Sequence, residues 1–483
     1  MNTILLQPTD VLFFRDGRPM SGSLAGHGAA WPLPHVINAA FHAALHRAFR
    51  DQPDIGVSHA PARRENGQRK YAAKGERDRR FVDVWSLGPF PVNAEGRWFF
   101  PRPADAQEAG TAALTLQPAR GHGANGAWSG SSLPSPLRYA VGNTRPPAKE
   151  AGGEPWLSEK AFAAYLGQKD LTTEKPDLHF LKDDAILDRE QTIGIAIDPD
   201  TQTTGQGEAT GKIYSAHYLR LREGFRLGTA AGDGCNGEAS LFDDLFEADQ
   251  RIVVGGQQRV CTVESRRTER LRLPLGATSF SKHEASGKFL VKWVLLTPAI
   301  WPEIPAERGG QRIHDRDGRP IIAHQGGWLP NWIDLQGKVR LKAVQGQRLA
   351  GMPRKAWRDA LQRSPEIQAS LVTAIVPKPI PITGWALGHP GSKSEIENQK
   401  SEIIDTGAKS THLAVPAGAV YYFEADSSDA AAALANALNW HGSESNPATI
   451  KNRRSTLLGE KGYGLGVCGT WDFYENAANP RNP

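Results

Sequence analysis

The amino-acid sequence predicts an α+β protein built from two domains, which cover residues 1–285 and 286–483. Three observations lead to this prediction. Each half contains several strand-like runs, each half contains one clear helix, and a fresh strand begins near Gly287, after a junction at residues 270–287. A chain of 483 residues, 39% of them hydrophobic, is also long enough to form more than one core.

The first half opens with a strand, a loop and a helix. Residues 3–14 are rich in apolar side chains, as strands are, and the loop that follows is rich in glycine, serine and proline. The segment 34–50, PHVINAAFHAALHRAFR, then has the spacing of an amphipathic helix. Its apolar side chains recur every four residues, at Ile37, Phe41, Leu45 and Phe49.

An aromatic-rich hairpin is predicted at residues 81–103, with Asn-Ala-Glu-Gly as its turn. Residues 104–155 are rich in small residues and proline and have no clear period, which indicates long loops or an insertion that becomes ordered on binding. Four short strands are expected after this stretch, at residues 193–197, 214–221, 251–254 and 258–263.

The second half begins with a strong strand pattern, GKFLVKWVLLTPAIW, at residues 287–301. Short strands and glycine- or proline-rich connections follow. The one clear helix is AAAALANALNW at residues 430–440, which Ser428 and Asp429 can cap. A last strand region is expected at residues 463–473, after a basic and glycine-rich loop.

The positive charge of the chain is concentrated in one stretch. The net charge is +5, and residues 63–80 hold eight Lys or Arg against three Asp or Glu, an excess equal to the whole net charge. Such a run is either a solvated surface insertion or an arm that contacts nucleic-acid phosphates. We rank four of its cations as second-tier candidates for RNA contact: Arg63, Arg64, Arg69 and Lys70.

The cysteines and the hydropathy of the sequence argue against a disulfide-rich, a zinc-binding or a membrane-spanning protein. Cys235, Cys261 and Cys468 are far apart and form no CxxC pair, so neither a disulfide framework nor a cysteine-rich zinc site is expected. The sequence shows no apolar run of membrane-spanning length, and its start does not read as a signal peptide. We expect a cytoplasmic protein that does not interact with membranes.

Three patterns resemble cofactor or metal sites but fail on their surroundings. The GxGxxG at residues 464–469 is followed by too little chain for a dinucleotide-binding unit. GQGEATGK at residues 205–212 has the wrong spacing for a phosphate loop and lacks the magnesium-binding Ser or Thr. Residues 198–202 begin like a calcium loop without its glycine or distal Glu. We expect no cofactor and no metal.

A glycine-rich loop with cations precedes the first helix. Arg15 and Arg18 flank an Asp-Gly turn, and His27 and Gly28 lie in the same loop just before the helix begins. Glycines let a backbone approach phosphates closely, and a helix N-terminus favours anions. These four residues are therefore candidate RNA contacts.

A second glycine-rich loop lies near the end of the sequence. Lys451 and Arg453, which rank second as candidates, lead into Lys461 and Tyr463, whose ring is of the kind that stacks on a base. Gly462, Gly464 and Gly466 complete this candidate site. Two basic glycine loops that bracket an α+β chain favour RNA as ligand over a small metabolite.

The order of sequence blocks resembles a known family. PTDVLFFRDGRPM, WPLPHVINAAFHAAL, SLGPFPVNAEGRWFFPRPAD, VVGGQQRVCTVE, FLVKWVLLTPAIW, VPAGAVYYFE and EKGYGLGVCGTW all have counterparts in it, in this order. The family is the third subunit of the Cmr-type (type III-B) CRISPR RNA-targeting complex, within the RAMP superfamily. The stretches 63–80 and 104–155 resemble additions to it.

The resemblance implies a fold and a role. The fold is two ferredoxin-like, RRM-related domains with long insertions. The role is to bind and cap the 5′ tag of the guide RNA (crRNA) in antiviral defence, without catalysis. The implied partners are the guide RNA, the large cyclase-bearing subunit and the backbone RAMP subunit, with target RNA contacted only indirectly.

Two other functions stay open at this point. RAMP relatives include metal-independent endoribonucleases that process precursor crRNA, and a histidine cluster would suit such an enzyme as general base. The cluster comprises His27, His35, His42 and His46, and the spacing of the last two implies no third metal ligand. A purely architectural subunit, held by protein contacts alone, is the third possibility.

Overall fold

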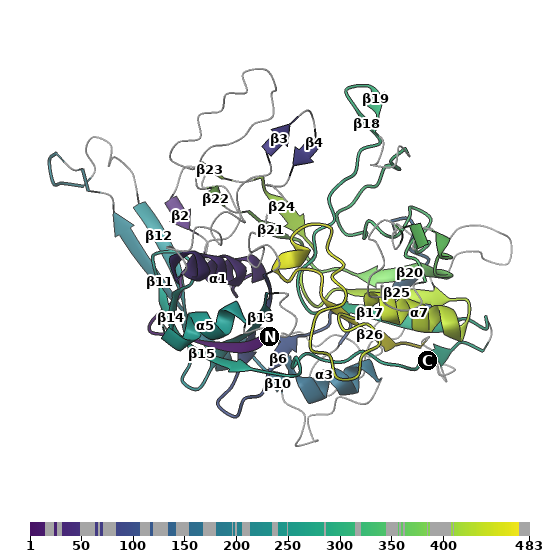
Figure 1. Cartoon of the computed structure of the whole chain (residues 1–483), viewed down its shortest axis with the longest axis horizontal. Coiled ribbons are helices and arrows are strands. Elements are labelled where there is room, and N and C mark those ends of the chain that lie inside the picture. Colours follow the sequence, from purple (N-terminus) through teal and green to yellow (C-terminus); the bar gives the residue numbers. More distant parts are fainter. Residues whose placement is uncertain are drawn as a thin grey trace, which may run out of the picture.

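Figure 1 shows the computed structural model of the chain, in which two groups of strands lie side by side. The structure describes residues 1–14, 24–26, 31–48, 63–65, 68–70, 84–106, 116–118, 134–141, 154–167, 180–195, 197–198, 200–204, 213–233, 240–248, 250–284, 286–313, 320–343, 356, 359–360, 363–383, 385–386, 407–408 and 410–472. No helix among these residues is long and apolar enough to cross a membrane.

The first half of the chain forms a five-stranded antiparallel sheet in the order β14-β15-β1-β13-β5. Its strands are β1 (Asn2–Pro8), β5 (Trp85–Val92), β13 (Arg226–Gly232), β14 (Arg251–Val253) and β15 (Val260–Arg267). The helices α1 (Pro34–Ala48) and α5 (Leu241–Ala248) cover one face of this sheet (Figure 1). The first strand of the chain therefore lies in the middle of the sheet.

The helix-covered face forms its core from the predicted apolar positions. Ile4 and Leu6 alternate along β1 and are buried beneath the helices. On α1, Phe41 is buried and its ring centroid lies 5.4 Å from that of Phe242 on α5. The predicted helix is confirmed from Pro34 to Ala48, and its last two residues lie outside the described part of the chain.

The second half repeats the same strand order. Its main sheet runs β26-β17-β25-β20, all antiparallel, with β16 beside the start of β17. The elements are β16 (Ser281–Lys282), β17 (Phe289–Leu295), β20 (Ala369–Ile375), β25 (Val420–Ala425), α7 (Ser428–Leu438) and β26 (Gly466–Thr470). When the four main strands of each half are numbered by their order in the chain, both sheets run fourth-first-third-second. These strands are β15-β1-β13-β5 in the first half and β26-β17-β25-β20 in the second. The side chain of Ser427 caps α7, one residue earlier than predicted.

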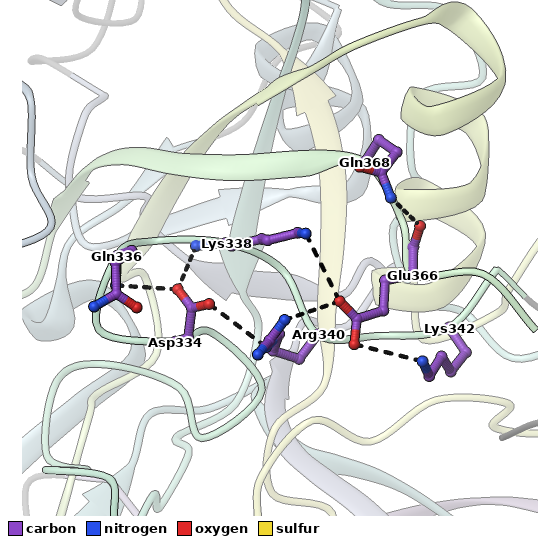
Figure 2. A network of polar contacts seen from close by, with 7 residues as sticks. All are labelled: Asp334, Gln336, Lys338, Arg340, Lys342, Glu366 and Gln368. Carbon is purple, nitrogen blue, oxygen red and sulfur yellow. Dashed lines mark hydrogen bonds and ion pairs between the residues drawn. The ribbon is translucent and has the colours of Figure 1, made fainter. Parts of the chain in front are cut away.

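An extended segment, paired along the edge of the sheet, stands in the chain where the first half has α1. Residues 338–342 pair with the chain leading into β20, because Lys338 and Lys342 bridge to Ser370 and Glu366. Figure 2 shows three cations of this segment around Glu366, whose carboxylate lies 3.0 Å from Arg340, 3.4 Å from Lys342 and 4.0 Å from Lys338. Partial burial opposes ionisation, but the charges of Arg340 and Lys342 outweigh it and lower the pKa of Glu366.

Smaller elements surround the two sheets. One three-stranded sheet joins β6 (Phe99–Pro101), β9 (Trp156–Ser158) and β10 (Phe180–Leu181), next to α3 (Glu159–Leu166) and α4 (Asp183–Ile186). Another joins β11 (Leu187–Ile195), β12 (Ile213–Leu221) and β2 (Leu24–Gly26), and η3 (Gly459–Lys461) is a short 3₁₀ helix. The two-stranded pairs are β3 (Arg63–Glu65) with β4 (Gln68–Lys70), β7 (Leu116–Pro118) with β8 (Tyr139–Val141), β18 (Glu307–Arg308) with β19 (Gln311–Arg312), β21 (Ile380–Ile382) with β24 (His412–Ala414), and β22 (Trp385–Ala386) with β23 (Gly407–Ala408).

The two main sheets share one core. Their faces opposite the helices contribute Leu87 and Ala230 from the first half and Leu290 and Val420 from the second, and Tyr165 of α3 belongs to the same cluster. Each sheet therefore has helices on its outer face, α1 and α5 in the first half and α7 in the second, and a common apolar layer on its inner face. Residues from both halves form one packed unit.

The segment that follows the predicted aromatic hairpin places the carboxylate of Asp105 in this shared core. The turn of the hairpin is confirmed, since Val92 pairs with Trp98 and the amide of Arg97 donates to the Asn93 side chain at 2.9 Å. After β6 the chain reaches the second half, where the amide of Ala104 donates to the carbonyl of Gly418 at 2.8 Å. The next residue is Asp105, which is fully buried.

A buried ionic cluster forms around Asp105. Nζ of Lys292 on β17 lies 3.4 Å from Oδ2 of Asp105 and 3.7 Å from the ring centroid of Tyr165. The hydroxyls of Tyr165 and of Tyr422 on β25 both donate to the Asp105 carboxylate. Burial lowers the pKa of Lys292, and the neighbouring Asp105 counteracts this by favouring the ammonium. The cluster thus joins α3 and the segment after β6 in the first half to β17 and β25 in the second.

We expect Asp105→Ala to destabilise the protein strongly. The change leaves Lys292 buried without its counter-charge, which costs about 3–5 kcal/mol of unfolding free energy. Urea unfolding followed by tryptophan fluorescence measures the loss. Glu366→Ala is the matched control. Glu366 also pairs with several cations, but these lie in a network at the surface, where the loss of unfolding free energy is under about 1 kcal/mol. Equal losses in the two variants would contradict the role assigned to Asp105.

Candidate nucleic-acid interface

The glycine-rich loop near the end of the sequence packs against the start of the first helix. The hydroxyl of Tyr463 lies 2.6 Å from Nδ1 of His35, in the first turn of α1. Gly462 has a left-handed φ of 90°, and a Cβ there would lie 2.7 Å from the carbonyl oxygen of Ser86 on β5. The two segments that the sequence singles out separately therefore meet on one side of the first sheet.

The N-terminal candidates Arg15, Arg18, His27 and Gly28 lie outside the described residues. The described residues on either side of that loop are well anchored. The carbonyl of Phe13 accepts a hydrogen bond from Gly256 at 2.9 Å, and Nε1 of Trp31 donates to the carbonyl of Pro89 at 2.9 Å. The flanks of the loop are thus fixed to the hairpin turn between β14 and β15 and to β5.

The structure places Tyr463, the residue predicted to stack on a base, inside the protein. Its ring is fully buried against Ile300, Ile382 and Ala414, so neither face is open to a base. Burial also raises the pKa of Tyr463 above its ordinary value. The residue links the two halves of the chain through its hydroxyl and holds His35.

Packing inside the protein accounts for the neighbouring glycines. A Cβ at Gly464 would overlap Ser455, and a Cβ at Gly466 would overlap the indole of Trp293. Close approach of chain segments requires glycine at both positions. The sequence suggests that these glycines leave room for a phosphate. In the structure, contacts within the core explain why glycine is needed at both positions.

The cations near this loop differ in their partners. Lys451 forms an ion pair with Glu444 at 2.9 Å. Burial lowers the pKa of Arg453, whose Nε has no hydrogen-bond partner among the described residues. Arg454 donates from Nε to the carbonyl of Ala437 at 2.7 Å, near the end of α7.

Lys461 and the second-rank cations of the first half complete the candidate set. Lys461 is the last residue of η3 and is half-buried. The strands β3 and β4 pair Arg63 with Lys70 and Arg64 with Arg69. These four residues therefore lie on a two-stranded ribbon within the basic stretch.

The strands predicted at residues 193–197 and 214–221 overlap β11 and β12, but the sequence did not predict that these two strands pair into a projecting ribbon (Figure 1). One face carries Leu187, which is buried at the base, and then Ile193 and Ile195, which are 70% and 54% exposed. Residues two apart along a strand share a face, so this face also carries Arg189 and Gln191, and its two isoleucines are exposed beyond them. Alternating isoleucines normally predict a buried strand face, and only the unusual length of the strand distinguishes this case.

Ion pairs hold the opposite face of the ribbon. Arg222 lies 2.8 Å from Asp188 on the neighbouring strand. Arg220 contacts Glu190 across the strands and lies 2.9 Å from Asp10, which follows β1. The ribbon is therefore fixed to the body by charges on one face, while the outer part of its other face presents Ile193 and Ile195.

The described histidines of the proposed nuclease cluster share one helix. His35 contacts Tyr463, whereas His42 and His46 lie farther along α1, and burial lowers the pKa of His46. His27 lies outside the described residues. Within the described part of the chain, no three His, Cys, Asp or Glu side chains gather as metal ligands would.

The chain is thus an α+β protein whose two sheets have the same strand order and whose glycine-rich segments meet beside α1. It belongs to the Cas_Cmr3 family of CRISPR-associated proteins, since the sequence model of that family matches residues 4–471. No curated protein matches this chain.

Solved structures with a similar course of the chain come from type III CRISPR complexes. A chain of the type III-B Cmr-beta complex bound to cognate target RNA and AMPPnP is 13% identical, with 87% of this chain and 86% of that chain covered and a TM-score of 0.34. A chain of the Csm3–Csm4 subcomplex of the type III-A interference complex is 10% identical, with 87% and 92% covered and a TM-score of 0.34.

We expect Tyr463→Phe to lower the free energy of unfolding by about 1 kcal/mol, because it removes one buried hydrogen bond while keeping the ring. His35→Ala removes the other partner of the same bond. A double-mutant cycle from urea unfolding measures the coupling between the two changes. Strictly additive losses would show that the hydroxyl and the imidazole do not interact.

Proposed function

We propose that this chain is the non-catalytic subunit that binds and caps the 5′ tag of the guide RNA in a type III-B CRISPR effector complex. Membership of the Cas_Cmr3 family over residues 4–471 is the observation that carries the proposal. The meeting of the segment around Tyr463 with the start of α1 supports it, because one RNA end can then contact cations from both halves. The site of action is the cytoplasm.

The repeated topology supports the ferredoxin-like interpretation. In the first half the elements follow the order β1, α1, β5, β13, α5, β15, which is the β-α-β-β-α-β order of that fold. The second half has the same strand order with an extended segment in place of the first helix. RRM domains of related topology bind single-stranded RNA, which fits a tag read through unpaired bases.

In the proposed binding mode, contacts to the RNA backbone and contacts to the bases have different roles. Lys461, Arg15 and Arg18 contact phosphates, which supply most of the affinity and make it dependent on salt. The ribbon of β11 and β12 supplies an apolar face with Ile193 and Ile195, beside which a strand of RNA can bend. The large cyclase-bearing subunit and the backbone RAMP subunit are the proposed protein partners, and target RNA is contacted only through the guide.

Binding of RNA by the full chain tests the proposal. A guide RNA with its 5′ tag is compared with one whose tag is scrambled, in EDTA and at two salt concentrations, and a gel shows whether the RNA stays intact. We expect preference for the tag and intact RNA. Cleaved RNA would instead favour the metal-independent endoribonuclease, whereas absence of tag preference would favour an architectural subunit.

We expect Lys461→Ala and Arg18→Ala each to weaken binding of the tagged RNA by about tenfold or more, as removal of one hydrogen bond to a charged group does. Each change also reduces the salt slope, by about 0.7 for every phosphate of a single strand that the protein no longer neutralises. Fluorescence anisotropy at several salt concentrations measures both quantities. Lys282→Ala, at an exposed lysine on β16, is the matched control and leaves both unchanged. Equal effects of all three changes would mean that affinity depends on net charge alone.

A further inference from the structure

The turn between β14 and β15 lies against the residues that lead into the basic N-terminal loop. Gly256 donates to the carbonyl of Phe13 at 2.9 Å, and Phe13 precedes Arg15 by two residues. A Cβ at Gly255 would lie 2.5 Å from that carbonyl oxygen, and one at Gly256 would lie 2.7 Å from the Phe13 ring. The turn therefore sits in direct contact with the residues that immediately precede the loop.

Two consecutive glutamines in this turn adopt a backbone conformation that favours glycine. Gln257 and Gln258 have φ values of 55° and 52°, in the left-handed region. For a residue with a Cβ this region costs about 1–2 kcal/mol. Such backbone strain concentrates where side chains have a function, and both glutamines are exposed.

The side-chain amide of Gln257 is held in one orientation. Its Oε1 accepts hydrogen bonds from the Tyr218 hydroxyl at 3.0 Å and from Nη2 of Arg259 at 3.2 Å. A guanidinium can only donate, so the atom that faces Arg259 must be the oxygen. None of the contacts described for Gln257 uses its amide nitrogen, whose two N–H groups therefore point away from this pair.

The residues that orient this amide are themselves fixed. The guanidinium of Arg259 lies 5.1 Å from the centroid of the Tyr218 ring and 3.6 Å from Asp10. The rings of Tyr218 and Phe13 are tilted against each other at 5.5 Å, and both are half-buried. The result is an exposed hydrogen-bond donor on a fixed support, beside an aromatic pair whose member Phe13 lies two residues before Arg15 in the sequence.

We propose that the amide nitrogen of Gln257 reads one base of the guide RNA by donating to an acceptor on that base. This inference rests on the proposed function, whose candidate residues it extends to the body of the first half. Because both lone pairs of Oε1 are used within the protein, the side chain presents donors only. It therefore favours a base that offers a ring nitrogen or carbonyl oxygen at that edge and disfavours one that offers an amino group.

Substitution of this one side chain tests the inference. The full chain is titrated with fluorescent single-stranded RNAs in which every nucleotide of the 5′ tag is varied in turn. We expect wild-type protein to favour one base at one position, and Gln257→Ala to reduce that preference about fivefold, as removal of one hydrogen bond does. The preferences at the other positions remain as in the wild type.

Two further variants separate reading of a base from support of the turn. Gln257→Glu keeps an oxygen for Tyr218 and Arg259 but has no N–H to offer, so it also loses the preference at that position. Its added negative charge lowers the affinity for all RNAs alike. The readout is therefore the ratio of the affinities for RNAs that differ in one base. Gln258→Ala, at the other left-handed residue, keeps the preference and serves as the matched control.

Each result bears on the inference. Loss of one preference in both Gln257 variants, with unchanged melting temperature in Gln257→Glu, supports it. Tag binding with every preference intact in Gln257→Ala would overturn the inference and leave the proposed function standing. An equal loss for all RNAs together with a lower melting temperature would also overturn it, by assigning Gln257 to the turn alone. Absence of RNA binding by the wild type would overturn both.

Discussion

One buried carboxylate fixes how the two halves of this protein sit against each other. Asp105 has no exposed surface, and its two oxygens accept the hydroxyls of Tyr165 and Tyr422 and face the ammonium of Lys292. A buried charge is tolerated only when its partners are in place, so a small shift between the sheets would leave Asp105 or Lys292 unpaired. Apolar layers alone permit sliding, whereas this cluster permits a single arrangement.

That arrangement has consequences for the candidate interface. The segment that contains Gly462 and Tyr463 belongs to the second half, yet it contacts β5 and α1 of the first. It reaches them only if the sheets keep the register that the cluster around Asp105 imposes. The outer faces of the sheets differ correspondingly. The first is covered by α1, which presents His35, and α5, and the second by α7, while the extended segment with the cations around Glu366 pairs along the edge at β20.

Local patterns predicted the helices better than they predicted the roles of the glycines. The spacing of apolar residues in α1 and the cap of the alanine-rich α7 are properties of short segments, so the sequence reveals them. The short helices α3 and α5 went unrecognised because each spans only eight residues, although the apolar pairs Leu241–Phe242 and Leu245–Phe246 of α5 do recur at helical spacing. Gly464 and Gly466 match a phosphate-binding pattern, but whether a glycine admits a ligand or another part of the chain depends on tertiary contacts. The buried position of Tyr463 depends on the same distant contacts.

Because these glycines are part of the core, their substitution is a poor guide to RNA contacts. A side chain at Gly464 or Gly466 would push apart segments that include Ser455 and Trp293, and the loop would lose its place beside α1 whether or not it touches RNA. Loss of binding in such variants would report on folding. Side chains that project from a fixed backbone are informative, since their removal leaves the packing unchanged. Gln257 meets this condition through an exposed amide that Tyr218 and Arg259 hold from behind, so a change in base preference there has a single physical origin.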